Sequence, residues 1–234
     1  MEARQEQILR WIVEEYIRTA EPVGSKFLAV KYCLDVSSAT VRNDMVLLED
    51  EGYIRSPHPS AGRIPTEKGY EYYLRHFMED KRTVEETGRL SAAIKNASSD
   101  ETALKTLAKT LVILSGETAI VAFGPDWSYY TGVSNLFQKP DFQDTENVQN
   151  ISELVDRFDD VVCQIFHAVS IQEPKVFLGQ ENPFGQDIAA VIIKYRLSNH
   201  VYGLIGLVGP MRMNYAKNMA LVQEAREAID RMVA

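Results

Sequence analysis

The stretch Ser37-Ser38-Ala39-Thr40-Val41-Arg42-Asn43-Asp44 decides the fold of the first third of this chain. The hydroxyl of Ser37 or Ser38 can accept a hydrogen bond from a free backbone N–H group, which is how helices commonly begin. Downstream, apolar side chains recur every three or four residues up to about Glu51, as on the buried face of an amphipathic helix. We therefore expect a helix over residues 38–51 with a polar outer side.

Two earlier helices are expected upstream of this stretch. Residues 5–20 have the apolar spacing of an amphipathic helix, and a proline and a glycine follow it. Residues 26–32 form a short second helix capped by Ser25. Its apolar side chains are available for a core: Phe27, Leu28 and Val30. Residues 34–36 leave room only for a tight turn before the third helix.

A short hairpin is expected directly after the third helix. Gly52 is typical of the position just past a helix end, residues 53–56 predict a strand, and its partner begins at Ile64. Between the strands, residues 57–63 are rich in proline and glycine and predict a polar turn. Two helices joined at a tight turn and followed by such a hairpin describe a winged helix-turn-helix, which reads duplex DNA.

The helix over residues 38–51 is the candidate recognition helix, because the second helix of a helix-turn-helix lies in the major groove. Arg42 could bond O6 and N7 of guanine, and Asn43 could bond adenine. Short hydroxyl side chains allow a close approach and can bond phosphate: Ser37, Ser38 and Thr40. The alternative is an ordinary surface helix with a solvated arginine, but the hairpin behind it favours DNA binding.

The hairpin supplies further candidates for DNA contact. Arg63, beside a glycine, would enter the minor groove or contact phosphate. His58 either adds a phosphate contact or is a turn histidine without a role. Arg55 and Lys68 flank the hairpin and would attract phosphate whatever the base sequence.

The composition limits the classes of protein to consider. The chain has 234 residues and a net charge of −8, whereas DNA-binding domains are usually basic. Positive charge is nevertheless concentrated locally, since residues 52–76 carry Arg55, Arg63, Lys68 and Arg75 against two glutamates. The two cysteines lie far apart in sequence and are expected to be buried thiols, without a disulfide or a zinc site. The start of the chain lacks the apolar segment of a secretory signal, so a cytoplasmic location is expected.

A second domain is expected beyond a charged stretch at residues 79–86, which gives a DNA-binding domain over 1–80 and a regulatory and dimerisation domain over 81–234. Strands are predicted at 118–123, 129–136, 176–178, 188–196 and 201–208. Helices are predicted at 84–115 in two parts, at 148–169 and at 212–232. The mixture predicts an α+β domain with an antiparallel sheet flanked by helices.

Patterns for catalysis are weak throughout the chain. The four histidines are scattered, and neither HExxH nor GxSxG occurs. Gly203, Gly206 and Gly209 fit a strand better than a phosphate loop. Cys163 and His167 are one helical turn apart but fit a helix packed on a sheet. No enzyme activity, metal or cofactor is therefore expected, although the loop at residues 181–185 could line a small-molecule pocket.

The order of these segments resembles the bacterial heat-inducible transcription repressor HrcA family. In the first domain the matching blocks are Glu15–Ile17, Glu21–Ser25, Ser37–Met45, Leu48-Glu49, Gly52-Tyr53, Pro57–Thr66 and Gly69-Tyr70. In the second they are Gly132–Leu136, Pro140–Phe142, Gly179–Asn182 and Val208–Tyr215. They occur in the family's order over most of the chain.

The resemblance implies a GAF-like second domain and a repressor of chaperone operons. The family binds an inverted-repeat operator in double-stranded DNA as a homodimer, and the GroEL chaperonin modulates it so that free chaperonin favours repression. Typical members carry an inserted dimerisation module, for which residues 123–132 leave no room here. The alternative is a regulator whose GAF-like domain senses a small ligand; an enzyme with an accessory winged helix is a third possibility that no residue cluster supports.

Overall fold

The computed structural model describes residues 1–59, 61–78, 84–95, 97–124, 127–143, 145–180, 182–197 and 201–233. It divides into two compact units, Met1–Glu79 and Asp80–Ala234. The expected boundary after residue 80 falls within residues 79–83, outside the described residues. Ser60 of the wing tip, Glu181 of the candidate ligand loop and the connection at 198–200 also lie outside them.

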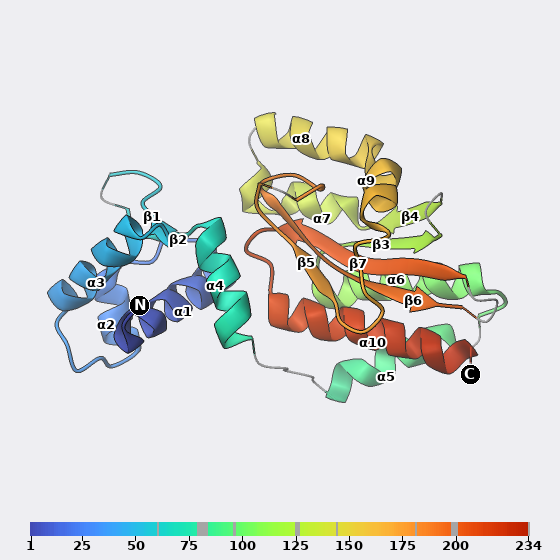
Figure 1. Cartoon of the computed structure of the whole chain (residues 1–234), viewed down its shortest axis with the longest axis horizontal. Coiled ribbons are helices and arrows are strands. Elements are labelled where there is room, and N and C mark those ends of the chain that lie inside the picture. Colours follow the sequence, from blue (N-terminus) through green and yellow to red (C-terminus); the bar gives the residue numbers. More distant parts are fainter. Residues whose placement is uncertain are drawn as a thin grey trace. The chain divides into compact units, whose positions relative to one another are not determined.

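The first unit is the predicted winged helix-turn-helix (Figure 1). Its elements are α1 (Ala3–Thr19), α2 (Ser25–Lys31), α3 (Ser38–Asp50), β1 (Ile54–Arg55), β2 (Ile64–Pro65) and α4 (Glu67–Phe77). β1 and β2 pair antiparallel, and Val23 adds a bridge to Arg63. The core is formed by apolar residues of α1, α2 and α3, among them Ile8, Leu9, Ile12, Leu28, Val41 and Leu48.

The short helix α2 differs from the sequence prediction. Gly24, not Ser25, precedes the helix as its N-cap. Only Leu28 of the three core candidates is buried, whereas Phe27 is 44% exposed and Val30 is 71% exposed. A helix of two turns presents only a narrow stripe to its neighbours, so side chains on its other sides remain in solvent.

The expectation of buried cysteines was wrong, because both thiols are exposed. Cys33 lies in the turn between α2 and α3, where its backbone is left-handed with φ of 48°. Cys163 lies on α9, between the buried Val162 and Ile165 but on the outer side of the helix.

A carboxylate network fastens α2 to α1. Glu15 is buried and accepts hydrogen bonds from Arg18, Lys31 and the Tyr32 hydroxyl. Burial raises the pKa of Glu15, but the bonds from Lys31, Arg18 and Tyr32 outweigh it and lower the pKa to about 2. The carboxylate therefore remains charged and paired in the folded chain at neutral pH.

The second unit is an α+β domain around a five-stranded antiparallel sheet with the order β4-β3-β7-β6-β5. Its strands are β3 (Thr118–Phe123), β4 (Ser128–Thr131), β5 (Lys175–Phe177), β6 (Ile188–Arg196) and β7 (Tyr202–Pro210). Its helices are α5 (Val84–Ile94), α6 (Asp100–Ser115), α7 (Val133–Gln138), α8 (Thr145–Asp156), α9 (Phe158–Ile165) and α10 (Tyr215–Val233), with a 3₁₀ turn at Pro140–Phe142. The described helices are all too short or too polar to cross a bilayer.

Helices cover both faces of this sheet (Figure 1). α6 and α10 pack on one face, with α5 against them, while α7 and α9 contact the sheet on the other side and α8 packs on α9. Successive side chains of each strand therefore point alternately towards the helices on one face and the helices on the other. Ile120, Ile192 and Leu204 join the core beneath α8 and α9, and the sheet is buried on both faces.

Two predicted elements of the second unit are corrected by the structure. The strand expected over 129–136 ends at Thr131, because Gly132 takes a left-handed conformation with φ of 82° and α7 begins at Val133. The single helix expected over 148–169 is divided into α8 and α9 at Arg157, whose backbone is not helical. Apolar spacing continues across both breaks, so it could not reveal them.

Gly203→Ala is expected to destabilise the second unit by about 1–3 kcal/mol, because a buried overpacked side chain forces its neighbours apart. A Cβ atom on Gly203 would meet the Ala122 carbonyl and the Tyr195 ring, whose hydroxyl donates to that carbonyl at 2.9 Å. Gly88→Ala on the exposed side of α5 is the matched control, since its Cβ meets nothing within 4 Å. Urea unfolding of both variants tests this, and equal stabilities would contradict it.

Glu15→Gln is expected to destabilise the first unit by about 1–3 kcal/mol at pH 7, because hydrogen bonds to a charged carboxylate are replaced by weaker ones. The folded pKa of about 2 lies below the ordinary 4.5, so this stabilisation is present above pH 4.5 and is lost as the pH falls towards 2. The difference between variant and wild type should therefore shrink between pH 5 and pH 2. Trp11, stacked on Tyr32 at 4.3 Å, reports unfolding of this unit in a Trp127→Phe background. If the difference in unfolding free energy between Glu15→Gln and wild type does not change with pH, the stabilising role of the Glu15 carboxylate is refuted.

Candidate nucleic-acid interface

The start of α3 is fixed by the hydroxyls that the sequence singled out. Ser37 is the N-cap, and its Oγ accepts a hydrogen bond from the Thr40 backbone N–H at 3.1 Å. The hydroxyls of Ser37 and Thr40 also bond each other at 3.0 Å. Ser38 is the first helical residue, and both serines are exposed. These side chains therefore shape the end of the helix, and those of Ser37 and Ser38 remain accessible to a ligand.

The outer side of α3 carries the two candidate base readers. Arg42 and Asn43 are exposed, whereas Val41, Asp44, Met45 and Leu48 are buried on the inner side. Asp44 is a buried carboxylate that accepts hydrogen bonds from Arg4 of α1, Nε at 2.7 Å and Nη2 at 3.1 Å. This bidentate pair fixes the rotation of α3 on α1, so Arg42 and Asn43 point away from the protein.

The wing is joined to α3 by one carboxylate. Glu49 accepts a hydrogen bond from the Ser56 backbone N–H at 2.9 Å through Oε1. Its Oε2 accepts from Arg63, Nε at 2.8 Å and Nη2 at 2.7 Å. The guanidinium of Arg63 is thus turned towards Glu49, and the Arg63 side chain is only 21% exposed. Its expected minor-groove contact remains a prediction, and in this conformation Arg63 holds the wing.

The remaining wing candidates have different surroundings. His58 and Arg55 are exposed, and the His58 carbonyl accepts hydrogen bonds from the Ser56 hydroxyl and the Ala61 N–H. Lys68 donates to the Glu51 carbonyl at 2.7 Å and lies over the Tyr53 ring at 4.2 Å. Lys68 therefore links α4 to the end of α3, although its side chain is still exposed.

Gly62 allows the wing to approach the segment before α2. A Cβ atom there would meet the backbone of Pro22 and Val23. Arg63 and Val23 exchange two backbone hydrogen bonds of 2.8 and 2.9 Å directly beside it. The glycine is thus required by close packing.

A hollow of about 430 Å³ lies between α3, the start of α2 and the wing. Its charged lining residues are all basic: Lys26, Arg42 and Arg63. Ser25 and Ser56 add hydroxyl groups to the same lining. A polyanion is the ligand that such a hollow suits, because each cation attracts phosphate. The sequence pattern did not single out Lys26, whose only signal was a basic residue at the start of the helix before the recognition helix.

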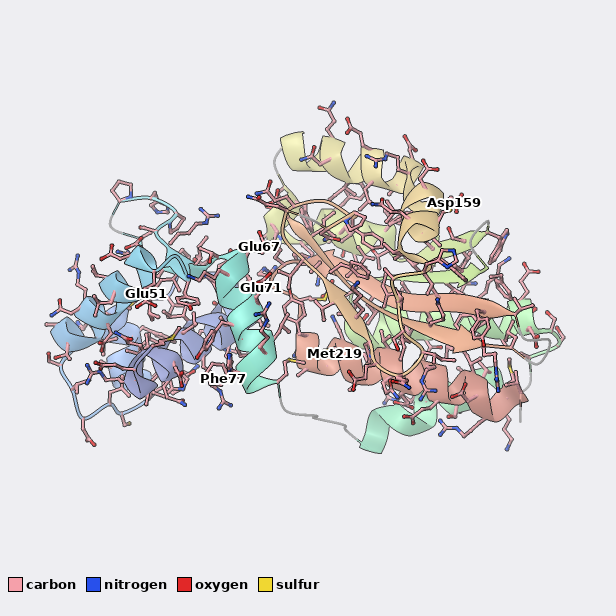
Figure 2. All side chains as sticks on the ribbon, viewed as in Figure 1. Glu51, Glu67, Glu71, Phe77, Asp159 and Met219 are labelled. Carbon is pink, nitrogen blue, oxygen red and sulfur yellow. The ribbon has the colours of Figure 1, made fainter. Side chains whose placement is uncertain are left out.

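Three acidic residues of this unit are absent from the lining of the hollow. Figure 2 shows Glu51 at the far end of α3 and Glu67 and Glu71 on α4. The charged residues that line the hollow are basic instead, and Asp44 of α3 is buried and paired with Arg4. The net charge of −8 therefore does not describe the candidate DNA-binding surface.

The second unit contains a separate hollow of about 370 Å³ between α8 and the loop before β6. Phe184 and Pro183 of that loop line it, together with Arg157 and Glu153 of the α8 side. Asn182 shapes the loop by donating to the carbonyls of Gly185 and Ile188. Among the described residues, no group of three metal-binding side chains is close enough to hold a cation.

Comparison with known proteins assigns both units to one family. The family model described as "HrcA protein C terminal domain" matches residues 40–219, and "Winged helix-turn-helix transcription repressor, HrcA DNA-binding" matches residues 1–78. A heat-inducible transcription repressor HrcA of Bifidobacterium animalis is 48% identical over 120 residues, which are 51% of this chain and 33% of that relative. The chain thus matches about a third of this relative's length.

A second relative aligns from end to end. The heat-inducible transcription repressor HrcA of Halalkalibacterium halodurans is 25% identical over 336 aligned positions, covering 98% of this chain and 97% of the relative. Because the alignment is longer than the 234 residues of this chain, the relative has a long stretch that this chain lacks.

One solved structure has the same fold. A crystal structure of a hypothetical protein at 2.2 Å resolution superposes with a TM-score of 0.74 at 20% identity, covering 100% of this chain and 98% of that one. Taken with the winged helix, the two family models show that the chain belongs to the HrcA family of transcription repressors.

Proposed function

We propose that this chain represses heat-shock genes by binding an inverted-repeat operator in double-stranded DNA as a homodimer. The observation that carries the proposal is the outward-facing pair Arg42 and Asn43 beside a hollow whose charged residues are all basic. In this arrangement α3 enters the major groove and the adjacent backbone passes between α3 and the wing. The family membership supplies the gene class, and the repressor acts in the cytoplasm, where its DNA lies.

The expected contacts divide into two kinds. Arg42 and Asn43 read base edges, while Ser37, Ser38 and Thr40 lie where the backbone enters the groove. Arg55, His58, Arg63 and Lys68 contribute phosphate attraction from the wing side, and Lys26 joins them. Arg63 reaches phosphate only by leaving Glu49, so its first role is to hold the wing.

Chaperonin control is the second part of the proposal. The GroEL chaperonin stabilises the DNA-binding form, and chaperonin occupied by damaged proteins no longer does so. A gel shift on the DNA upstream of the organism's chaperonin genes, with and without GroEL, tests this together with the mass of the free repressor. We expect a dimer and a larger bound fraction with GroEL. A monomer without operator preference would overturn the operator model, and a GroEL-independent shift would overturn the chaperonin model alone.

A ligand-responsive regulator is the second candidate. The hollow of about 370 Å³ beside Phe184 and Arg157 favours it, because its lining combines apolar side chains with polar and charged ones. A thermal-shift screen of metabolites separates the two candidates, since a ligand that binds only the folded chain raises its melting temperature. If no compound raises it, this candidate fails while the chaperonin model stands.

Arg42→Ala is expected to weaken specific binding by about 1–3 kcal/mol and to relax selectivity at one base pair in each half-site. The reason is loss of a bidentate contact to guanine. Binding of the variant to a set of single-base operator substitutions measures the effect. A uniform loss on every sequence, random DNA included, would assign Arg42 to phosphate.

Lys26→Ala is expected to weaken specific and random duplexes alike and to lower the salt dependence of binding by about one released counterion. Titrations of log affinity against log salt concentration give the slope. Lys109→Ala, an exposed lysine on α6 of the second unit, is the matched control and should leave the slope unchanged. An unchanged slope for Lys26→Ala would remove this residue from the interface.

A further inference from the structure

Val46 is an exposed apolar residue on the side of α3 that carries the candidate base readers. It is 41% exposed. Successive helical residues are about 100° apart, which places Val46 about 40° from Arg42 and about 60° from Asn43 around the axis. The buried residues Val41, Asp44, Met45 and Leu48 occupy the opposite side. Val46 therefore lies close to the centre of the outward face.

Neither packing nor helix stability accounts for a valine at this position. Its side chain is not part of the buried core of the unit. Valine is a poorer helix former than alanine, leucine or lysine in an exposed site. Leu47 next to it is 48% exposed, but leucine is among the better helix formers, and this position lies about 140° from Arg42. Helix propensity thus accounts for the exposed Leu47 but not for the exposed Val46.

A thymine methyl group is the ligand that fits Val46. In the major groove thymine presents its C5 methyl group beside polar base edges, and apolar side chains recognise it by contact. The branched side chain of valine is stiff, so it loses little conformational freedom on contact. Ala39, also exposed and about 20° from Val46, keeps the same side of the helix free of bulk.

We propose that Val46 reads the C5 methyl group of a thymine in each operator half-site, an inference that rests on the proposed function. Four residues of helix advance about 6 Å, so this thymine lies about two base pairs from the pair read by Arg42, at 3.4 Å per base pair. Asp50 is exposed one helical turn after Val46. Its negative charge would repel phosphate, so the contact between α3 and DNA is expected to end before it.

The experiment begins with selection of the best-bound duplexes from a random pool by the full chain. Each thymine of the selected site is then replaced by uracil, which removes only the methyl group. Wild type should bind about three- to fivefold more weakly at one thymine per half-site, the effect of losing one buried methyl group. Val46→Ala should bind the thymine duplex more weakly by a similar factor and lose its sensitivity to uracil at that position alone.

Leu47→Ala is the matched control and should keep the wild-type uracil profile. Circular dichroism verifies that the variants fold, and substitution of exposed residues is expected to leave folding intact. A selected site that wild type binds tightly but without sensitivity to any uracil would overturn the inference and leave the proposed function standing. If Val46→Ala keeps the wild-type sensitivity to uracil at every position, the inference about Val46 is likewise overturned and the proposed function stands. A pool that yields no preferred sequence would instead refute operator binding itself.

Discussion

The carboxylate of Glu49 is the interaction on which the DNA-binding geometry depends. It belongs to α3, yet both of its oxygens are used by the wing, Oε1 by the Ser56 N–H and Oε2 by Arg63. The strands β1 and β2 have only two residues each, and so short a hairpin is not stable alone. Glu49 therefore sets the distance between helix and wing, and with it the hollow between them.

A second carboxylate acts on the same helix from the inside. Asp44 is buried and paired with Arg4 of α1. This contact between α1 and α3 determines how α3 is rotated about its axis. Rotation by one residue, about 100°, would exchange the exposed Asn43 for a buried side chain. Asp44 and Glu49 of α3 are thus both paired with arginines of the same unit, which leaves the outward face of the helix for Arg42, Asn43 and Val46.

The sequence predicted the elements of the first unit well because each begins or ends at a local signal. Two of these signals are the helix N-caps Ser37 and Thr66, and a third is Gly52, which has a positive φ just after α3. Each acts only on the turn of chain next to it. Arg63 shows the limit of such reasoning. An arginine beside a glycine at a wing tip is typical of DNA contact, but its guanidinium is paired with Glu49, fourteen residues earlier in the chain. Lys26 was missed for the same reason, since only the fold brings it beside Arg42.

The second unit shows how distant sequence blocks become one structure. Glu117, directly before β3, is buried and bonded to Lys139 at 3.1 Å, and Asn135 of α7 donates to the Glu117 backbone carbonyl. Arg212, just past β7, is bidentate with Asp141 at 2.6–2.9 Å. Burial raises the pKa of Glu117, and the charge of Lys139 opposes that rise. A Cβ atom on Gly209 would collide with the Glu117 carboxylate, so only glycine leaves room for this carboxylate.

Three blocks by which the sequence resembles its family, at residues 132–136, 140–142 and 208–215, therefore meet around this pair of ion pairs. A buried ion pair contributes little net stability compared with apolar packing, but removal of one partner leaves an uncompensated charge in the interior. Such a network tolerates little change in its parts, so it accounts for a shared residue pattern without any ligand. The proposed DNA contacts lie instead in the first unit, where the outward residues Arg42, Asn43 and Val46 of α3 take no part in the buried core.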